Sequence, residues 1–322
     1  MQELEIIGTV ESSIAKIEIL PNAILQLEAQ GQFAWEEFFS GQIRNKYTRA
    51  AYLHAVKAFL KWIEPQEPQL ARVTPGLVGR YFDHLRISIP SKKLHMSAIR
   101  GFFDVLVLRH VCMLNPALSV RTERYSVSEG KTPEITPQQA RQLLESVDTA
   151  SPSGIRDKAI IATLIFTAVR AGAVAKLRMQ DLVNEGSQYS LRFSEKGGKQ
   201  RAIPIRHDLQ VMLFQYLDLL GGGESKDSPL FRSVSRKGTY SELGLSGVDI
   251  CRLVKRRLRF AELPQQISPH SFRSCTATSL LLQGTPLEDV QYLLGHSDSR
   301  ITKLYDRRQR QITRNIVERI SV

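Results

Sequence analysis

A histidine and a tyrosine stand nine residues apart near the end of the chain, in the stretch HSDSRITKLYDRR at residues 296–308. Four of these thirteen residues are Lys or Arg. A phenol has a reference pKa of about 10, so Tyr305 would need help in losing its proton before it could act as a nucleophile. The alternative is that Tyr305 is an ordinary aromatic residue.

A second pair of reactive side chains lies in the preceding stretch PHSFR, residues 269–273. Ser268 followed by Pro269 is typical of a helix start. This start places His270 and Arg273, at i and i+3, on one helical face, where both side chains can bind a phosphate. Taken in isolation, the same pattern is also explained by a surface His and Arg on a helix.

Arg170 lies inside the apolar segment AIIATLIFTAVRAGAVAKLRMQDL. An arginine in such a segment costs free energy unless it has an anionic partner or reaches a cleft. An ion pair with a nearby carboxylate, such as Asp181, is the structural alternative to a role in binding substrate.

The segment PLEDVQYLLGHSD predicts a helix that ends in a cap at Gly295 and is followed by His296 at the turn. Ser297 or Asp298 then caps the next helix, and Tyr305 is expected two turns into it.

Length and composition set the framework for these residues. A chain of 322 residues has room for two domains, and its formal charge of +12 favours a polyanionic partner. The acidic start MQELEIIGTVESS does not support a secretory signal, and no apolar run is long enough to span a membrane. Three dispersed cysteines, without a C-x-x-C pair, fit neither a disulfide framework nor a zinc site. We therefore expect a cytoplasmic protein.

The charge is unevenly distributed along the chain. Residues 1–40 hold seven Glu against one Lys, whereas residues 41–110 hold twelve Lys or Arg against four Asp or Glu. Apolar spacing predicts a basic amphipathic helix at 47–63, a helix from Val73 to Leu85 opened by Thr74 and Pro75, and a third over 91–110. A small basic helical domain follows from this pattern. The acidic segment is either an arm that contacts protein or a solvated leader helix.

Residues 121–137 are polar and aperiodic, which is typical of a linker. A mostly helical region follows, interrupted at 189–205 by a predicted β-hairpin whose tip carries Lys196 and Lys199. Residues 252–260, RLVKRRLRF, predict a helix with five basic residues in nine.

Together these pieces resemble the tyrosine recombinase (phage integrase) family, which includes Xer-like, Cre-like and lambda-integrase-like enzymes. The ordered motifs carry the resemblance: TAVR, SEKGGK, PHSFR, LLGHS and TKLYDRR. The residues that match the family's catalytic set are Arg170, Lys196, His270, Arg273, His296 and Tyr305. The catalytic resemblance covers 137–322, and the basic segment 41–120 is similar to the family's core-binding domain.

The chemistry of phosphodiester cleavage requires such residues: an activated nucleophile, donors for the equatorial oxygens, and an acid for the leaving alkoxide. Arg170 and Arg273 would hold the nonbridging oxygens, and the histidines would donate hydrogen bonds to the phosphate. The resemblance implies that His270 also assists proton removal from Tyr305, and that Lys196 protonates the departing 5′ oxygen. Lys196 is preferred to Lys199 because, by the resemblance, it occupies the family's lysine position directly before the Gly-Gly turn.

The resemblance also implies a covalent 3′-phosphotyrosine intermediate that needs neither ATP nor metal, and no cofactor is expected. The expected fold is mainly α with a small β-hairpin or sheet, forming a two-domain, C-shaped DNA clamp. The expected domains are an acidic arm at 1–40, a DNA-binding domain at 41–120, a linker at 121–136 and a catalytic domain at 137–322.

The implied partners are double-stranded DNA and further copies of the chain, as a dimer on each site and a tetramer in the synapse, with accessory proteins as a further class and no membrane. Residues 310–322 space Ile312, Ile316, Val317 and Ile320 on one helical face, so we expect this segment to dock on a neighbouring protomer; the alternative is that it folds back on its own domain.

Two positions depart from the family pattern. Ala173 stands where the family commonly has an acidic residue, and TAVR replaces the usual Thr-Gly-Leu-Arg. Ala173 therefore leaves a catalytically weak DNA-binding accessory protein open as an alternative to a site-specific recombinase. A type IB topoisomerase-like relaxase, which shares the pocket but religates the same strand, is the other alternative.

Overall fold

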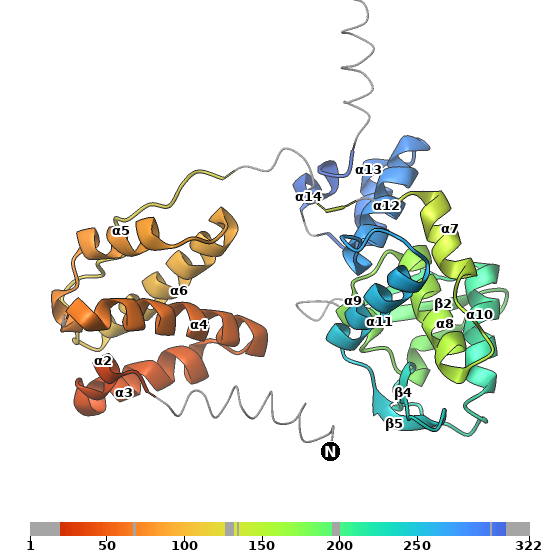
Figure 1. Ribbon diagram of the computed structural model, residues 1–322, viewed down its shortest axis with the longest axis horizontal. Coiled ribbons are helices and arrows are strands. Elements are labelled where there is room, and N and C mark those ends of the chain that lie inside the picture. The colour runs from red at the N-terminus through yellow and green to blue at the C-terminus, as the bar shows by residue number, and fades with distance from the viewer. Residues whose placement is uncertain are drawn as a thin grey trace, which may run out of the picture. The chain divides into compact units, whose positions relative to one another are not determined.

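The computed structural model describes residues 20–66, 69–125, 132–133, 135–194, 200–296 and 298–306 (Figure 1). The chain divides into two compact units, Met1–Ser126 and Val127–Val322, whose boundary falls within the segment 121–136. The described residues are mainly helical, with small antiparallel sheets in the second unit, which confirms the predicted fold class. Among them, no helix is long and apolar enough to cross a membrane.

The first unit is a helical bundle (Figure 1). Its elements are α2 (Asn22–Leu25), α3 (Glu28–Glu36), a π-helical turn (Glu37–Gln42), α4 (Lys46–Ile63), short 3₁₀ turns (Glu64–Gln66 and Leu70–Arg72), α5 (Pro75–His84) and α6 (Ile89–Leu108). The basic amphipathic helix predicted at 47–63 is confirmed as α4, which begins at the N-cap Asn45. Thr74 caps α5 and Pro75 occupies its first turn, as the sequence predicts.

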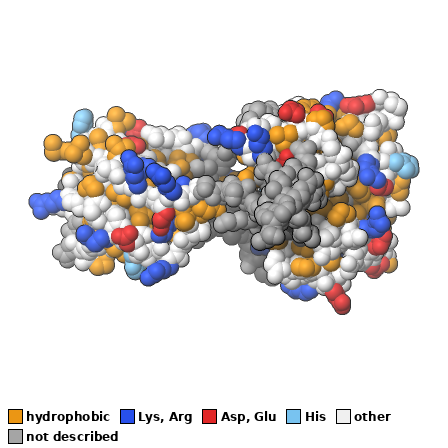
Figure 2. Space-filling view, turned by 90° about the horizontal axis from the view of Figure 1, so that it is seen from above, with side chains coloured by type: hydrophobic (Ala, Val, Ile, Leu, Met, Phe, Trp, Pro, Cys, Tyr) orange, Lys and Arg blue, Asp and Glu red, His pale blue; other side chains and the backbone are white. Residues whose placement is uncertain are grey.

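An aromatic cluster holds the helices of the first unit together. The Trp35 ring centroid lies 4.5 Å from that of Phe39 and 5.6 Å from that of Phe102. All three side chains are buried, so they join α3, the π-helical turn and α6 in one apolar core. Because the buried faces are apolar, the charged residues of these helices are left at the surface. Figure 2 shows adjacent Lys and Arg side chains on this unit.

The second unit carries the remaining described elements. Its helices are α7 (Pro137–Glu145), α8 (Pro152–Thr167), α9 (Ala171–Val174), α10 (His207–Asp218), α11 (Gly247–Phe260), α12 (Pro269–Leu282), α13 (Leu287–Leu294) and α14 (Ser299–Lys303). The basic helix predicted at 252–260 is confirmed as part of α11, which begins earlier because Ser246 and Asp249 form a capping box.

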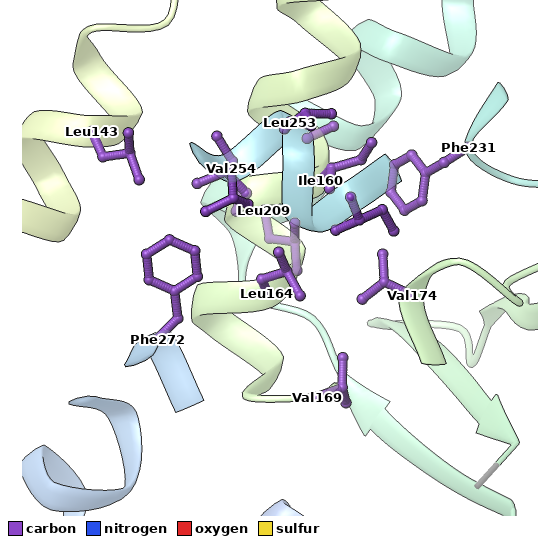
Figure 3. Close-up of a cluster of buried hydrophobic side chains, with 14 of the residues drawn as sticks. Leu143, Ile160, Leu164, Val169, Val174, Leu209, Phe231, Leu253, Val254 and Phe272 are labelled. Carbon is purple, nitrogen blue, oxygen red and sulfur yellow. The ribbon is translucent and has the colours of Figure 1, made fainter. Parts of the chain in front are cut away.

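α8 is the central helix of this unit. Ile160 and Leu164 of α8 are fully buried, and Figure 3 shows them among Leu209 of α10, Val254 of α11 and Phe272 of α12. This apolar contact fixes the end of α8, where Arg170 follows, against the start of α12, where His270 and Arg273 lie.

Two small sheets complete the unit. β1 (Leu182–Asn184), β2 (Tyr189–Ser194) and β3 (Gln200–Pro204) form an antiparallel sheet in that order, and β4 (Arg232–Val234) pairs with β5 (Tyr240–Gly244). The predicted hairpin is confirmed as β2 and β3, with Leu191 opposite Ile203. The sequence did not predict β1 or the β4–β5 pair, because strands of three to five residues leave too short an alternating pattern.

Candidate active site

The start of α12 brings the predicted histidine to the predicted nucleophile. The Ser268 N–H donates to the Ser271 hydroxyl at 3.1 Å, and Pro269 occupies the first turn, so α12 begins where the sequence predicts. His270 lies in this first turn, and its Nε2 is 3.5 Å from the Tyr305 hydroxyl oxygen. The two side chains are 35 residues apart in sequence, and the fold brings them to the outer limit of a hydrogen bond.

The backbone around Tyr305 differs from the prediction in one respect. α14 spans only Ser299–Lys303, with Asp298 as its N-cap, so Tyr305 follows the helix instead of lying two turns inside it. The Tyr305 N–H still donates to the Thr302 carbonyl at 3.0 Å, and the ring is buried. The expectation that Tyr305 lies two turns inside the helix was wrong, because the helix ends at Lys303 with Leu304 as its C-cap.

His296 faces Tyr305 from the turn after α13. Gly295 adopts the predicted left-handed conformation with φ 61°, which ends α13 and turns the chain. The His296 and Tyr305 rings are nearly parallel, at 9°, with centroids 6.0 Å apart. The Nδ1 atom of His296 lies 2.9 Å from the Thr302 hydroxyl oxygen. Burial, together with the positive charges of Arg273 and Arg170, lowers the pKa of His296 to about 4, so the ring is neutral near pH 7.

A neutral imidazole carries one N–H, and the Thr302 hydroxyl can either donate to Nδ1 or accept from it. When the Thr302 hydroxyl donates to Nδ1, the proton is on Nε2, which can then donate to a phosphate. We expect Thr302→Val, which keeps the shape of the side chain, to slow phosphate cleavage about tenfold. The free energy of unfolding should fall by about 1–3 kcal/mol, because the buried Nδ1 of His296 loses its hydrogen-bond donor. Single-turnover cleavage and urea unfolding measure both effects.

Thr163→Val is the matched control for this substitution. Thr163 is equally buried, and its hydroxyl donates to the Ala159 carbonyl within α8. It should lower the free energy of unfolding without altering cleavage. An unchanged rate in Thr302→Val would refute the role assigned to the Thr302 hydroxyl.

The lowered pKa of His296 also predicts a pH dependence of stability. Below pH 6.5 the unfolded chain binds a proton at this residue that the folded protein does not accept until about pH 4. Stability is therefore lost as pH falls from 7 towards 4. We expect this histidine to account for about 2 kcal/mol of the loss between pH 7 and pH 5. The check is urea unfolding of the wild type and His296→Gln at both pH values, where the variant should lose about 2 kcal/mol less.

His270 is more exposed than His296, and its pKa is also lowered. The causes are burial and the positive charges of Arg273 and Arg170. A lowered pKa keeps this imidazole neutral near pH 7, so that Nε2 can accept the Tyr305 proton. The same two arginines act on both histidines, which indicates that these four side chains form one cluster whose positive charge comes from the arginines.

Arg273 is held in place by main-chain oxygens. Its guanidinium donates from Nη1 to the Ala168 carbonyl at 2.7 Å and from Nη2 to the Leu294 carbonyl, and the side chain is 1% exposed. Carbonyl oxygens orient the guanidinium and carry no formal negative charge. Ala173, at the position where an acid is common in the family, lies half-buried on α9.

Arg170 reaches the surface between α8 and α9. It is the N-cap residue of α9, and its exposed side chain makes no hydrogen bond or ion pair with another residue that the structure describes. Arg170 forms no ion pair with Asp181, the proposed alternative, and that carboxylate instead accepts from the Arg178 backbone N–H at 2.8 Å. An exposed guanidinium next to a buried one suits a site that receives an anion from solvent.

Two further residues that shape the cluster were not identified from the sequence. Arg201 of β3 is 7% exposed and donates to the carbonyls of Tyr292, at 2.8 Å, and Leu293, just before His296. It therefore connects the lysine-bearing hairpin to the turn that presents His296. An arginine in a basic chain gives no sequence signal for carbonyl acceptors about 90 residues away.

Ala168 is the second of these residues, and it occupies the usual glycine position of TAVR. It adopts the left-handed conformation with φ 52°, which costs an alanine about 1 kcal/mol. Its buried methyl group packs in a cluster with Leu294 and Tyr305, which returns about 0.8 kcal/mol. The two contributions are similar in size, so the replacement of glycine by Ala168 changes the free energy of folding little.

Lys196 lies outside the described residues, as do Ser297 and residues 310–322. The structure therefore brings Arg170, His270, Arg273, His296 and Tyr305 to one place and leaves the predicted general acid as a prediction.

Comparisons with known proteins cover both units. Residues 133–311 match the family model "Phage integrase family", and residues 35–110 match "Phage integrase, N-terminal SAM-like domain". Tyrosine recombinase XerD of Chlorobaculum tepidum is 28% identical over 294 residues, which are 87% of this chain and 90% of that protein. XerD of Rickettsia conorii is 33% identical over 224 residues, 65% of this chain and 70% of that protein.

A solved structure of XerH site-specific recombinase bound to palindromic difH substrate has a similar fold. It aligns with a TM-score of 0.73 at 17% identity and covers 96% of this chain and 89% of that one.

Proposed function

The chain belongs to the phage integrase family, and from this premise we propose that it is a site-specific DNA recombinase that cuts and rejoins DNA through Tyr305. The observation that carries the proposal is the 3.5 Å approach of the Tyr305 hydroxyl to His270 Nε2 inside a cluster that contains two arginines. Double-stranded DNA is the substrate, and no cofactor takes part.

Residues of this chain supply the nucleophile, the proton acceptor, the positive charges and the proton donor for the proposed cleavage step. The Tyr305 oxygen attacks the scissile phosphorus while His270 accepts the phenolic proton. Two negative charges build up on the phosphorus oxygens, and Arg170, Arg273 and the Nε2–H of His296 stabilise them. The bond to the 5′ oxygen breaks, and that oxygen takes a proton from Lys196. The product is a 3′-phosphotyrosine with a free 5′-hydroxyl end.

The reverse reaction explains why no energy source is needed. A phenol is a good leaving group, so a 5′-hydroxyl from a second duplex can attack the phosphotyrosine and restore the phosphodiester. The number of phosphodiester bonds is conserved, and strands are exchanged when the attacking end comes from the other site.

Covalent capture tests this proposal. A binding site is first selected from a pool of random duplexes, and a nicked version then lets the short 5′ end diffuse away after cleavage. We expect a protein–DNA adduct that survives denaturation, and a phosphorylated peptide that maps to Tyr305. Two duplexes carrying the site should then yield recombinants.

Two outcomes would contradict the proposal. Equal relaxation of supercoiled plasmids with and without the selected site would identify a topoisomerase-like enzyme. Specific binding without any adduct would identify a DNA-binding accessory protein.

The domain roles form part of the same proposal. Residues 41–120 act as a DNA-binding domain and 137–322 as the catalytic domain, joined by 121–136, so that the two enclose the duplex. The α4 helix supports the first role, since Arg49, Lys57 and Lys61 lie between its apolar residues along the sequence and are not buried. The free thiols of Cys112, Cys251 and Cys275 suit the reducing cytoplasm, where we place the protein.

The C-terminal segment should join protomers in the synapse. Residues 310–322 carry four apolar residues at helical spacing, a face that gains from burial against another copy. We expect deletion of 310–322 to preserve binding of one protomer to a half-site and to abolish the tetramer on two sites. Native gel shift with increasing protein measures both, and unchanged tetramer formation would show that the segment folds back on its own domain.

A further inference from the structure

A group of arginines surrounds one buried carboxylate in the second unit. Asp157 of α8 is fully buried. Arg156 donates to Asp157 from Nη2 at 2.7 Å, Arg256 from Nη2 at 3.0 Å and Arg257 from Nε at 2.8 Å. Three cations around a single anion leave two positive charges uncompensated within this group. Such an excess is costly inside an isolated protein and becomes favourable when an anion joins the group.

The same arginines line an open pocket of about 420 Å³. Arg236, from the loop between β4 and β5, adds a fourth guanidinium, and Ser151 and Ser153 add hydroxyl groups. The lining, all of it in the described part of the chain, includes no carboxylate. Both Asp157 oxygens are already occupied by the arginines, so this carboxylate does not repel an anion that enters the pocket.

Several hydrogen-bond donors at the pocket form no hydrogen bond with a residue that the structure describes. Arg256 uses only one nitrogen, Nη2, and its side chain is 53% exposed. Arg236 is exposed and makes no hydrogen bond or ion pair with any residue that the structure describes. Ser151 caps the 16-residue helix α8, so the positive end of this helix also faces the pocket. Guanidinium forks, hydroxyl groups and a helix N-terminus are the groups that bind phosphate in proteins.

We propose that this pocket is a second phosphate-binding site, distinct from the one that holds the scissile phosphate. Figure 1 shows β4 and β5 at the end of the unit opposite α13 and α14, the helices that lead to Tyr305. Because the proposed substrate is duplex DNA, the phosphate is supplied by its backbone, some distance from the cut. A free phosphate compound has the same chemistry and is the other source. The inference rests on the proposed function for its choice of source.

The contact is tested by combining changes in the protein with changes in the DNA. Single neutral methylphosphonates are placed in turn along the selected duplex, and binding is measured for the wild type, Arg236→Gln and Arg256→Gln. We expect one position, away from the scissile phosphate, to lower the affinity of the wild type about tenfold and to have almost no effect in the variants. A plot of the logarithm of the DNA association constant against the logarithm of salt concentration has a negative slope. Its magnitude should be smaller by about 1 in each variant than in the wild type.

Arg141→Gln is the matched control for the loss of one charge. Arg141 is exposed on α7 and outside the pocket, so this variant should keep the full penalty at the sensitive methylphosphonate position. Arg236→Gln leaves the Asp157 group intact, so it stays informative if Arg256→Gln proves unstable.

The result identifies the source of the phosphate. If the penalty of a methylphosphonate at one DNA position disappears in the arginine variants, the phosphate in the pocket comes from the DNA backbone. Binding of inorganic pyrophosphate by the wild type, its loss in Arg256→Gln and no DNA coupling would support a free phosphate compound and overturn the backbone source. If neither DNA coupling nor pyrophosphate binding is observed, the arginines only join α8 to α11, and the proposal is overturned. Covalent capture by Tyr305 is scored in the same samples, so a failure of the recombinase function itself is seen separately.

Discussion

Tyr305→Phe is expected to bind its DNA site with unchanged affinity and to form less than about 1/10⁴ of the covalent adduct of the wild type. The substitution removes only the attacking oxygen. The ring remains buried and stacked on His296, and among the described residues the hydroxyl loses one long hydrogen bond, at 3.5 Å to His270. The free energy of unfolding should therefore change by less than about 1 kcal/mol. Capture on a nicked duplex, resolved on a denaturing gel, measures the adduct, and native gel shift measures binding.

Tyr292→Phe is the control for removing a phenol close to the site. Tyr292 lies on α13, 70% exposed, and its hydroxyl contacts no other residue that the structure describes. This variant should capture DNA at the wild-type rate. Adduct formation by Tyr305→Phe, or its loss in Tyr292→Phe, would disprove the assignment of the nucleophile.

The parts of the site that depend on local rules could be predicted from the sequence. The start of α12 follows from Ser268 and Pro269, and the turn before His296 follows from Gly295, whose φ of 61° is costly for other residues. The β2–β3 hairpin follows from alternating residues on either side of a glycine turn. Each signal is complete within a few residues, so no knowledge of the tertiary fold is needed to identify it.

The parts that depend on main-chain acceptors could not be predicted. Arg273 bonds to the carbonyls of Ala168 and Leu294, and every residue type provides a carbonyl. The left-handed backbone of Ala168 was equally hidden, because alanine seldom adopts it. The Asp157 group could not be predicted for a third reason. The sequence RLVKRRLRF does not indicate whether a given arginine faces solvent or a buried acid.

The two arginines of the site should respond differently to the same substitution, although both bind the phosphate in the proposed mechanism. Arg273 is buried and bonded to two carbonyls, so Arg273→Gln should slow capture and also lower the free energy of unfolding by about 3 kcal/mol. The Arg170 side chain is exposed and bonds to no other described residue, so Arg170→Gln should leave the free energy of unfolding within about 0.5 kcal/mol of the wild type.

The effect of Arg170→Gln should appear in the chemical step. Loss of a permanent charge from the oxygens of the transition state is expected to slow single-turnover capture about 10³-fold at saturating DNA, where weaker binding no longer contributes. Arg170→Lys should recover little of the rate, because an ammonium group cannot present two parallel N–H donors to the phosphate. Lys176→Gln removes an exposed charge from the region just after α9 and should retain the wild-type rate. A wild-type rate in Arg170→Gln would mean that the exposed guanidinium does not touch the scissile phosphate, and the paired-arginine site would have to be abandoned.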